Sequence, residues 1–171
     1  MLDATAVRDG RMSAPVTLND RFTLAAPPER VASLLRGDVA GVVGCVPGAS
    51  VTADHGDGSY AATIGVHYGD TGVRFAGIAR LLEPAADNVT VHAEGQDGLG
   101  TIKASGDIAL ELAADGAGGT AVTLTATFAF SGVLAPLARS ATKIVGPQLI
   151  RSFTKCLSSK IAGAADTVER V

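Results

Sequence analysis

The chain of 171 residues has no tryptophan, only two tyrosines and five phenylalanines, and only two cysteines. It has no excess of positive charge, since its formal net charge is −3, and this argues against a nucleic-acid partner held by its phosphates. No apolar run approaches the roughly 18 residues of a membrane span, and no signal-peptide pattern opens the chain. Cys45 and Cys156 suit a reduced cytoplasmic protein better than a disulfide scaffold.

Small apolar side chains are abundant. Hydrophobic residues make up 47% of the chain although aromatic residues make up 4%, and there are 21 glycines. An interior of small side chains either packs very closely or leaves a hollow. The length fits one domain, which we expect over residues 15–168, and we expect residues 1–14 to be disordered.

The N-terminal half begins with a strand predicted from Val16 to Leu24. A helix is predicted to start at Pro28, which suits a first helical turn, and a short second helix covers Val39 to Val43. A long β tract follows, because turn signals recur along it. The turn signals are Gly56-Asp-Gly58, Gly69-Asp-Thr-Gly72, Ala85-Ala-Asp-Asn88, Gly95-Gln-Asp-Gly98 and Asp115-Gly-Ala-Gly-Gly119.

Apolar and polar residues alternate between these turns. The alternation is clearest over residues 102–112 and 122–130, and it predicts a sheet with one buried and one wet face. From Val133 to Val168 the apolar period becomes helical, and Gly146-Pro147 predicts a kink or two abutting helices. We therefore predict an α+β, helix-grip fold, in which a seven-stranded curved antiparallel sheet wraps around a long C-terminal helix and encloses a hydrophobic cavity.

A set of short motifs in fixed order narrows the family. The motifs are Ala26-Pro-Pro-Glu-Arg-Val31, Cys45-Val-Pro-Gly-Ala49, Asp57-Gly-Ser-Tyr60, Phe75-Ala-Gly77, Asp97-Gly-Leu-Gly100, Gly118-Gly-Thr120 and Ser131-Gly-Val-Leu-Ala135. Together they resemble the family of the carbon monoxide dehydrogenase G subunit, which belongs to the START-related SRPBCC superfamily.

The resemblance implies a non-enzymatic accessory protein of a molybdenum-hydroxylase-type dehydrogenase. It implies no covalent cofactor but a lipophilic ligand such as an isoprenoid quinone (menaquinone or ubiquinone) or another lipid. It also implies a cytoplasmic protein that makes peripheral contact with the inner face of the cell membrane and helps to couple the dehydrogenase to it.

Few residues suggest chemistry or metal binding. His67 and His92 fall on strand faces opposite the apolar residues, so we expect both on the solvated side of the sheet. His55 lies in a turn, and no second cluster with ligand spacing accompanies it, so no metal site is predicted. Cys45 lacks positive neighbours that would lower the pKa of its thiol, and we expect a small buried thiol in a loop at the cavity rim.

The predicted cavity lining is apolar, and we therefore predict no catalytic residue. Tyr68 is the main polar side chain expected to point inward, where its hydroxyl could bind a ligand carbonyl or a backbone group. The predicted ligand-binding residues are Cys45, Val46, Pro47, Val66, Tyr68, Phe75, Leu81, Val91, Ile102, Ile108, Phe128, Phe130, Leu137 and Phe153. Two alternatives stay open: a recruitment or assembly protein without a ligand, and a small-molecule cyclase or hydrolase of the same superfamily.

Overall fold

The computed structural model describes residues 15–68, 70–82 and 87–170, and omits the side chains of Tyr68, Thr71 and residues 163–170. The expectation of disorder over residues 1–14 lies outside the described residues. The elements follow the order β1 (Val16–Leu24), α2 (Pro28–Gly37), α3 (Val39–Val43), β2 (Ala49–Asp54), β3 (Ser59–Tyr68), β4 (Thr71–Leu81), β5 (Asn88–Asp97), β6 (Lys103–Ala114), β7 (Thr120–Ser131) and α4 (Ala135–Arg170).

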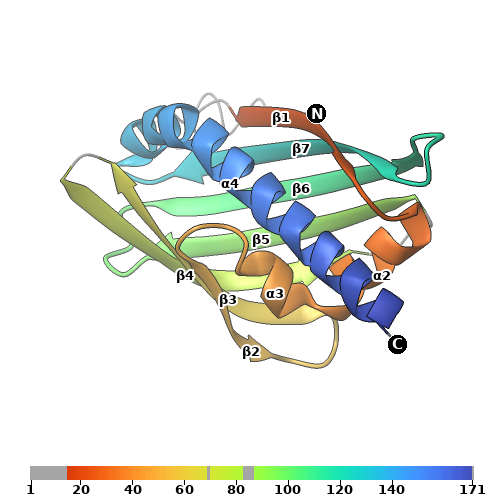
Figure 1. The fold of residues 1–171 in the computed structure, drawn as a ribbon. Helices are drawn as coiled ribbons and strands as arrows, with labels where there is room; N and C mark the ends of the chain where they lie inside the picture. Colours follow the sequence, from red (N-terminus) through yellow and green to blue (C-terminus); the bar gives the residue numbers. More distant parts are fainter. Residues whose placement is uncertain (1–14, 69, 83–86, 171) are drawn as a thin grey trace.

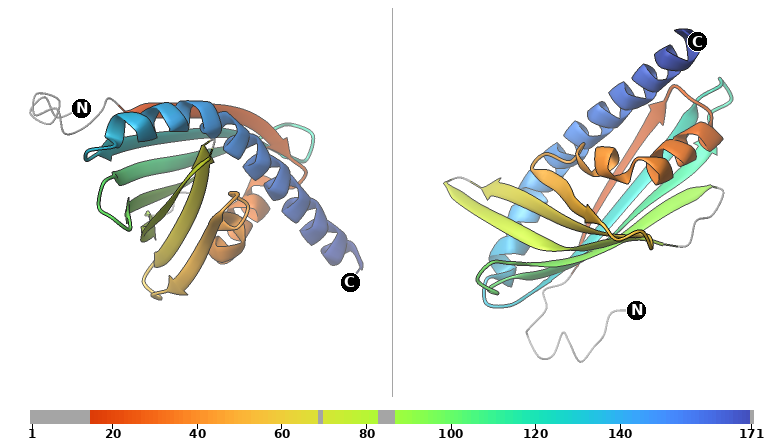
Figure 2. Two further views of the ribbon diagram at one scale, coloured as in Figure 1. Left: turned by 90° about the vertical axis from the view of Figure 1, so that its left-hand side faces the viewer. Right: turned by 90° about the horizontal axis from the view of Figure 1, so that it is seen from below.

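One antiparallel sheet contains all seven strands, in the order β1-β7-β6-β5-β4-β3-β2. The two edges are therefore β1 and β2, which α2 and α3 join (Figure 1). The sheet curves, and α4 lies across its concave side near β1 and β7 (Figure 2). The predicted helix-grip arrangement is confirmed, because an apolar sheet face needs a cover and α4 supplies it.

Glycine allows the strands to approach closely on the inner side of the curve. Gly77 pairs with Gly95 across β4 and β5. A Cβ atom added at Gly77 would lie 1.8 Å from the carbonyl oxygen of Glu94 and 2.5 Å from the Cα atom of Gly95. Only glycine fits at this point, since both neighbouring atoms belong to the backbone.

The C-terminal helix is continuous through Pro147. Its axis changes direction along its length (Figures 1 and 2), which agrees with a proline that cannot donate a hydrogen bond to the carbonyl of Lys143. The preceding Gly146 lies directly against β1, because a Cβ atom there would come within 2.5 Å of Cδ1 of Leu18. Of the two predictions, a kink is confirmed and two separate helices are not.

The turn predicted at residues 95–98 is displaced. Strand β5 continues to Asp97, and the turn follows it. The backbone amide of Asp97 donates to the carbonyl of Ile102, and the amide of Ile102 donates to Oδ1 of Asp97 (3.0 Å). These bonds extend the strand pairing beyond the glycine that suggested an earlier turn.

Two clusters of buried side chains form the core. The larger cluster joins α2, α4 and the strands β5, β6 and β7, with Val31, Leu157 and Ile161 almost wholly buried. The smaller cluster contains Val16, Ile102, Phe130 and Ala135 and closes the end of the molecule where α4 begins. The concave surface between the clusters is less completely covered.

Candidate functional site

The candidate site is the partly exposed apolar surface on the concave face of β3, β4 and β5, which we call the groove. The strand register places Ile64 opposite Phe75, and Val66 opposite Val73, on this face. These four side chains are only half-buried, in contrast to the core clusters. Ala93 lies opposite both Ala79 and Gly106, so small residues form the floor of the groove.

Most of the predicted lining residues lie on this concave side. The strands contribute half-buried side chains, and α4 contributes Phe153, which is buried in the larger cluster. The half-buried members are Val66, Phe75, Leu81, Val91, Ile108 and Phe128. Apolar side chains that stay partly accessible on a concave surface are typical of sites for lipophilic ligands.

Three predicted lining residues are placed differently. Ile102 and Phe130 are buried to 2% and 6% exposure in the smaller cluster, where they pack with Val16 and Ala135 and face no groove. Leu137 is 44% exposed, so its side chain is not buried between α4 and the sheet. The helical period had placed it with Leu134, which is itself exposed.

The predicted hydrogen-bonding role of Tyr68 concerns a side chain outside the described residues. A polar group that the sequence reasoning missed is Asp20. It shares the inner face of β1 with Leu18 and Phe22, is half-buried, and pairs with Leu124 of β7. Strict alternation from Val16 to Leu24 would have placed its carboxylate inward.

The two cysteines form a disulfide, Cys45–Cys156, with a Cα–Cα distance of 5.4 Å. The prediction of free thiols is therefore wrong, although the prediction that Cys45 is buried is confirmed by its 3% exposure. The bond joins the loop after α3 to α4. The two cysteines are separated by 111 positions in the chain, so their pairing can be recognised only from their distance in the folded structure.

The remainder of the 44–50 loop leads from α3 to β2. Val46 packs against the larger cluster, whereas Pro47 is exposed. Gly48 has φ +82°, and a Cβ atom there would lie 2.3 Å from the carbonyl oxygen of Gly65. The amide of Gly65 donates to the carbonyl of Gly48 (2.9 Å). This glycine therefore fixes the loop to β3 in a conformation that other residues rarely adopt.

A Ser-His-Asp cluster occurs in the turn between β2 and β3. The hydroxyl of the buried Ser59 donates to Oδ1 of Asp57 (2.6 Å), and its Oγ lies 3.0 Å from Nδ1 of His55. Because the hydroxyl proton points to Asp57, Nδ1 of His55 must donate to Oγ. His55 is therefore not placed to take a proton from Ser59, and the cluster shapes a hairpin turn.

Turn geometry also accounts for the shifted carboxyl groups. Hydrogen bonds from the side chain and the backbone of Ser59 lower the pKa of Asp57. The hydroxyl of Thr101 and the amide of Ile102 lower the pKa of Asp97. Donation from the amides of Ala117 and Gly119 lowers the pKa of Asp115. In each case the donors favour the charged carboxylate.

The other two histidines lie on the convex face. His67 is exposed and pairs with Gly72, while Nδ1 of His92 lies 2.8 Å from Oδ1 of Asp107. Glu94 is a second carboxylate neighbour of His92, at 3.8 Å. The prediction that both imidazoles face away from the apolar side is confirmed, so neither points into the groove.

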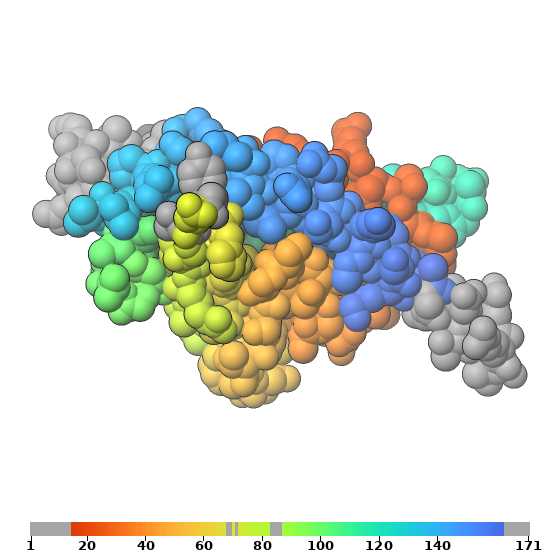
Figure 3. Space-filling model, turned by 60° about the vertical axis from the view of Figure 1, so that its left-hand side comes forward, coloured from red at the N-terminus to blue at the C-terminus, as the bar shows by residue number. Residues whose placement is uncertain are grey.

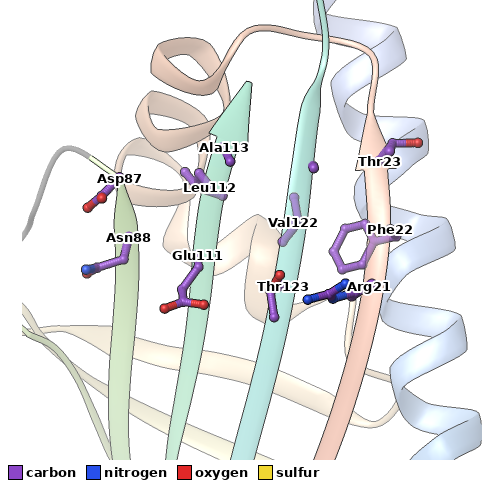
Figure 4. Close-up of a pocket in the computed structure, with 11 residues that line it drawn as sticks. Arg21, Phe22, Thr23, Asp87, Asn88, Glu111, Leu112, Ala113, Val122 and Thr123 are labelled. Carbon is purple, nitrogen blue, oxygen red and sulfur yellow. The ribbon is translucent and has the colours of Figure 1, made fainter. Parts of the chain in front are cut away.

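A polar hollow of about 600 Å³ lies on the convex face, near the ends of β1, β7, β6 and β5. The register aligns Arg21 with Thr123, Thr123 with Glu111, and Glu111 with Asn88, so four outward side chains form one row (Figure 4). The sequence reasoning missed this hollow because it treated the outward positions only as a wet surface.

Large apolar side chains are exposed where the β5–β6 and β7–α4 loops meet. Leu99 is 88% exposed and Val133 is 85% exposed. The loops are joined by the amide of Leu134, which donates to the carbonyl of Thr101. We call Leu99, Val133 and Leu134 the apolar tip. Exposed apolar clusters of this kind mark interaction surfaces.

In the part of the chain that the structure describes, no three His, Cys, Asp or Glu side chains are grouped as metal ligands would be. Among the described helices, none combines the length and hydropathy that crossing a bilayer requires.

Comparison with known proteins adds a family and a fold. The family model of the carbon monoxide dehydrogenase G subunit (CoxG) matches residues 21–162. No curated protein matches the chain. A conserved protein from Geobacillus kaustophilus has a similar structure, with 19% identity, a TM-score of 0.68, and coverage of 87% of this chain and 97% of that one.

Two proteins named for aromatase/cyclase activity also share the fold. The Zhui aromatase/cyclase from Streptomyces sp. R1128 is 14% identical, with a TM-score of 0.62 and coverage of 87% of this chain and 94% of that one. The di-domain ARO/CYC StfQ from the steffimycin biosynthetic pathway is 10% identical, with a TM-score of 0.64 and coverage of 95% and 54%. At these identities the likeness shows the fold alone.

Proposed function

The chain belongs to the CoxG family, that of the carbon monoxide dehydrogenase G subunit, and from that membership we propose that it is a non-enzymatic accessory protein of a molybdenum-hydroxylase-type dehydrogenase. In this role it takes up a lipophilic ligand, such as an isoprenoid quinone, in the apolar groove. The observation that carries the proposal is the half-buried apolar lining over a floor of small residues. Covering this surface with ligand would gain about 25 cal/mol for each Å² of apolar area removed from water.

The ligand and the membrane are linked in this proposal. A lipid-soluble quinone resides in the bilayer, so the protein must reach the bilayer surface to collect it. The apolar tip supports such a contact, and the exposed side chains of Lys103 and Lys143 belong to the adjacent β6 and α4. Cationic groups beside apolar side chains favour an anionic membrane surface. We accordingly place the protein in the cytoplasm, at the inner face of the membrane.

Ligand binding is tested by narrowing the groove. Ala93→Leu adds a larger side chain to the groove floor, whereas Ala109→Leu makes the same change at a half-buried site that pairs with Thr90 and Thr125 on the convex face. We expect the first variant to weaken binding of a short-chain quinone at least about tenfold, equivalent to about 1.4 kcal/mol. We expect the second to leave it unchanged. Equal binding by both variants, or no saturable binding by the parent protein, would refute the groove as the site.

A membrane contact is tested separately on the apolar tip. Leu99→Ser and Val133→Ser together should reduce co-sedimentation with vesicles that contain anionic phospholipid. Ile78→Ser is a control on β4, since that side chain is 42% exposed on the convex face. If all variants sediment like the parent protein, the apolar tip does not bind lipid.

A second candidate function is a cyclase or hydrolase, for which Asp20 offers an inward-facing carboxyl group on β1, since general acid–base chemistry needs a titratable group. Asp20→Asn would abolish turnover of a bound polyketide-like substrate if this function holds. It would leave quinone affinity unchanged if the protein is a carrier. A recruitment protein would retain dehydrogenase binding without any saturable ligand.

A further inference from the structure

We propose that the Cys45–Cys156 disulfide is a redox latch: it holds residues 38–47 against α4, and its reduction opens that side of the groove. This regulation rests on the ligand-binding function proposed above, but the movement itself can be measured without a ligand.

The disulfide joins α4 to a weakly packed segment that contains α3. No residue of α3 is buried, in contrast to α2, which buries Val31, Ala32 and Leu35. The space-filling view shows the α2–α3 region lying against α4 (Figure 3). Apart from the disulfide, α3 is tied to α4 by an ion pair at its N-cap, between Asp38 and Lys160 (3.7 Å). Both partners are partly exposed, so the pair contributes little.

The segment lies between two fixed elements, α2 and the sheet. Gly37 closes α2, and a Cβ atom there would have no neighbour within 4 Å. Gly48 is fixed to β3 through Gly65, so residues beyond it belong to the sheet. Residues 38–47 can therefore rotate between two fixed elements once the bond to α4 is broken.

Movement of this segment would uncover the groove. Val42 and Val46 are half-buried and pack against the larger cluster, beside which Leu81, Ile108 and Phe128 also pack. The last three are among the predicted ligand-binding side chains. Because the segment and these side chains pack against the same cluster, release of the segment would make the side chains more accessible to a ligand.

The chemistry is thiol–disulfide exchange with an external dithiol. Cys156 is half-buried and Cys45 is buried, so a thiolate of the reductant attacks Sγ of Cys156. The Cys45–Cys156 bond breaks, a mixed disulfide forms at Cys156, and the Cys45 thiolate takes up a proton. The second thiol of the reductant then releases Cys156. Two electrons and two protons pass to the protein, and the dithiol becomes a disulfide.

The first experiment measures hydrogen exchange in the protein without ligand. On reduction with dithiothreitol, the amides of Asp38 and Ala49 should exchange faster, because their bonds to the carbonyls of Leu34 and Val46 tie the two ends of the segment to α2 and β2. We expect about a tenfold increase for each 1.4 kcal/mol of lost constraint. The amide of Leu110 in β6 should not change. The double variant Cys45→Ser/Cys156→Ser should exchange like the reduced protein, and its exchange rates should not change when dithiothreitol is added.

The disulfide itself is checked by intact mass after alkylation. The oxidised protein should take up no alkylating groups and the reduced protein two; free thiols after treatment with diamide would overturn the proposal. Unchanged exchange at Asp38 and Ala49 on reduction would also overturn the proposal, and this exchange can be measured on the parent protein even if the serine variant fails to fold.

The second experiment links the latch to the ligand. Stopped-flow mixing with ubiquinone-2 should show an association rate at least about tenfold higher for the reduced protein. If exchange responds to reduction but ubiquinone-2 binds in neither state, the latch stands and the proposed ligand is wrong. If ubiquinone-2 binds at equal rates in both states, the groove stands and the latch is refuted.

Discussion

Replacing Gly77 by alanine tests whether close contact between β4 and β5 determines the curvature of the sheet. The added Cβ would lie 1.8 Å from the carbonyl oxygen of Glu94 and 2.5 Å from Cα of Gly95. Because both atoms are backbone, no side chain can rotate away, and the two strands must separate. Overpacking of this kind costs about 1–3 kcal/mol, and a lost ladder hydrogen bond costs about 1 kcal/mol more.

Alanine also restricts the unfolded chain, which returns about 0.4–1 kcal/mol. The free energy of unfolding should therefore fall by about 1–3 kcal/mol in Gly77→Ala. Gly65→Ala is a matched control on the neighbouring strand β3, because a Cβ atom there would have no neighbour within 4 Å. That variant should be unchanged or more stable by up to about 1 kcal/mol.

Urea unfolding followed by far-UV circular dichroism is a suitable assay, since the chain has no tryptophan for fluorescence. The midpoint should decrease in Gly77→Ala, with little change in the slope of the transition. A midpoint at or above that of the parent protein would refute the reasoning, since it would mean that the strands can separate at this point without loss.

Three further outcomes are expected. Leu157→Ala, at a wholly buried site, should lower the free energy of unfolding by about 2–5 kcal/mol, whereas Ile144→Ala, at a site that is 59% exposed, should change it by less than about 0.5 kcal/mol in the same urea assay. Reduction of Cys45–Cys156, which closes a loop with a separation of 111, should lower it by about 4–5 kcal/mol; an unchanged midpoint would contradict this. The lowered pKa of Asp97 means that its carboxylate stabilises the fold above the unfolded pKa near 3.8, and that this contribution is lost as pH falls through the lower folded value. Asp97→Asn should therefore weaken the acid dependence of stability below about pH 4, measured by urea unfolding across a pH series.

The regular elements could be predicted because their causes are local. Strand Val16–Leu24 and helix Val39–Val43 have the predicted bounds, since the first follows from alternation and the second from its Asp38 cap and the Gly44 that ends it. The β5–β6 turn was predicted too early in the chain because the positions of Gly95 and Gly98 suggested it. The hydrogen bonds between Asp97 and Ile102 that extend β5 involve a side chain and cannot be inferred from the glycines.

The candidate site was predicted less completely, because its missing parts depend on tertiary structure. The disulfide requires Cys45 and Cys156 to meet across 111 residues, which no spacing in the sequence indicates. Leu137 shares a helical period with Leu134 and Ile144, and all three are exposed because α4 covers only part of the sheet. The inward position of Asp20 could have been predicted from the alternation of β1. It was missed because only apolar residues were considered for the inner face.

The placement of β1 and β2 at opposite edges of one sheet has a consequence for how such a protein could change its ligand. Residues 25–48 run from one edge to the other, and Gly48 meets the interior strand β3 by accepting a hydrogen bond from the amide of Gly65. An insertion or deletion there would alter the width of the groove mouth and leave the register of the seven strands intact. Because α2 and Cys45 also belong to the larger core cluster, such a change would preserve the fold only where it spares these buried positions, and the exposed residues of this stretch are therefore the ones open to variation.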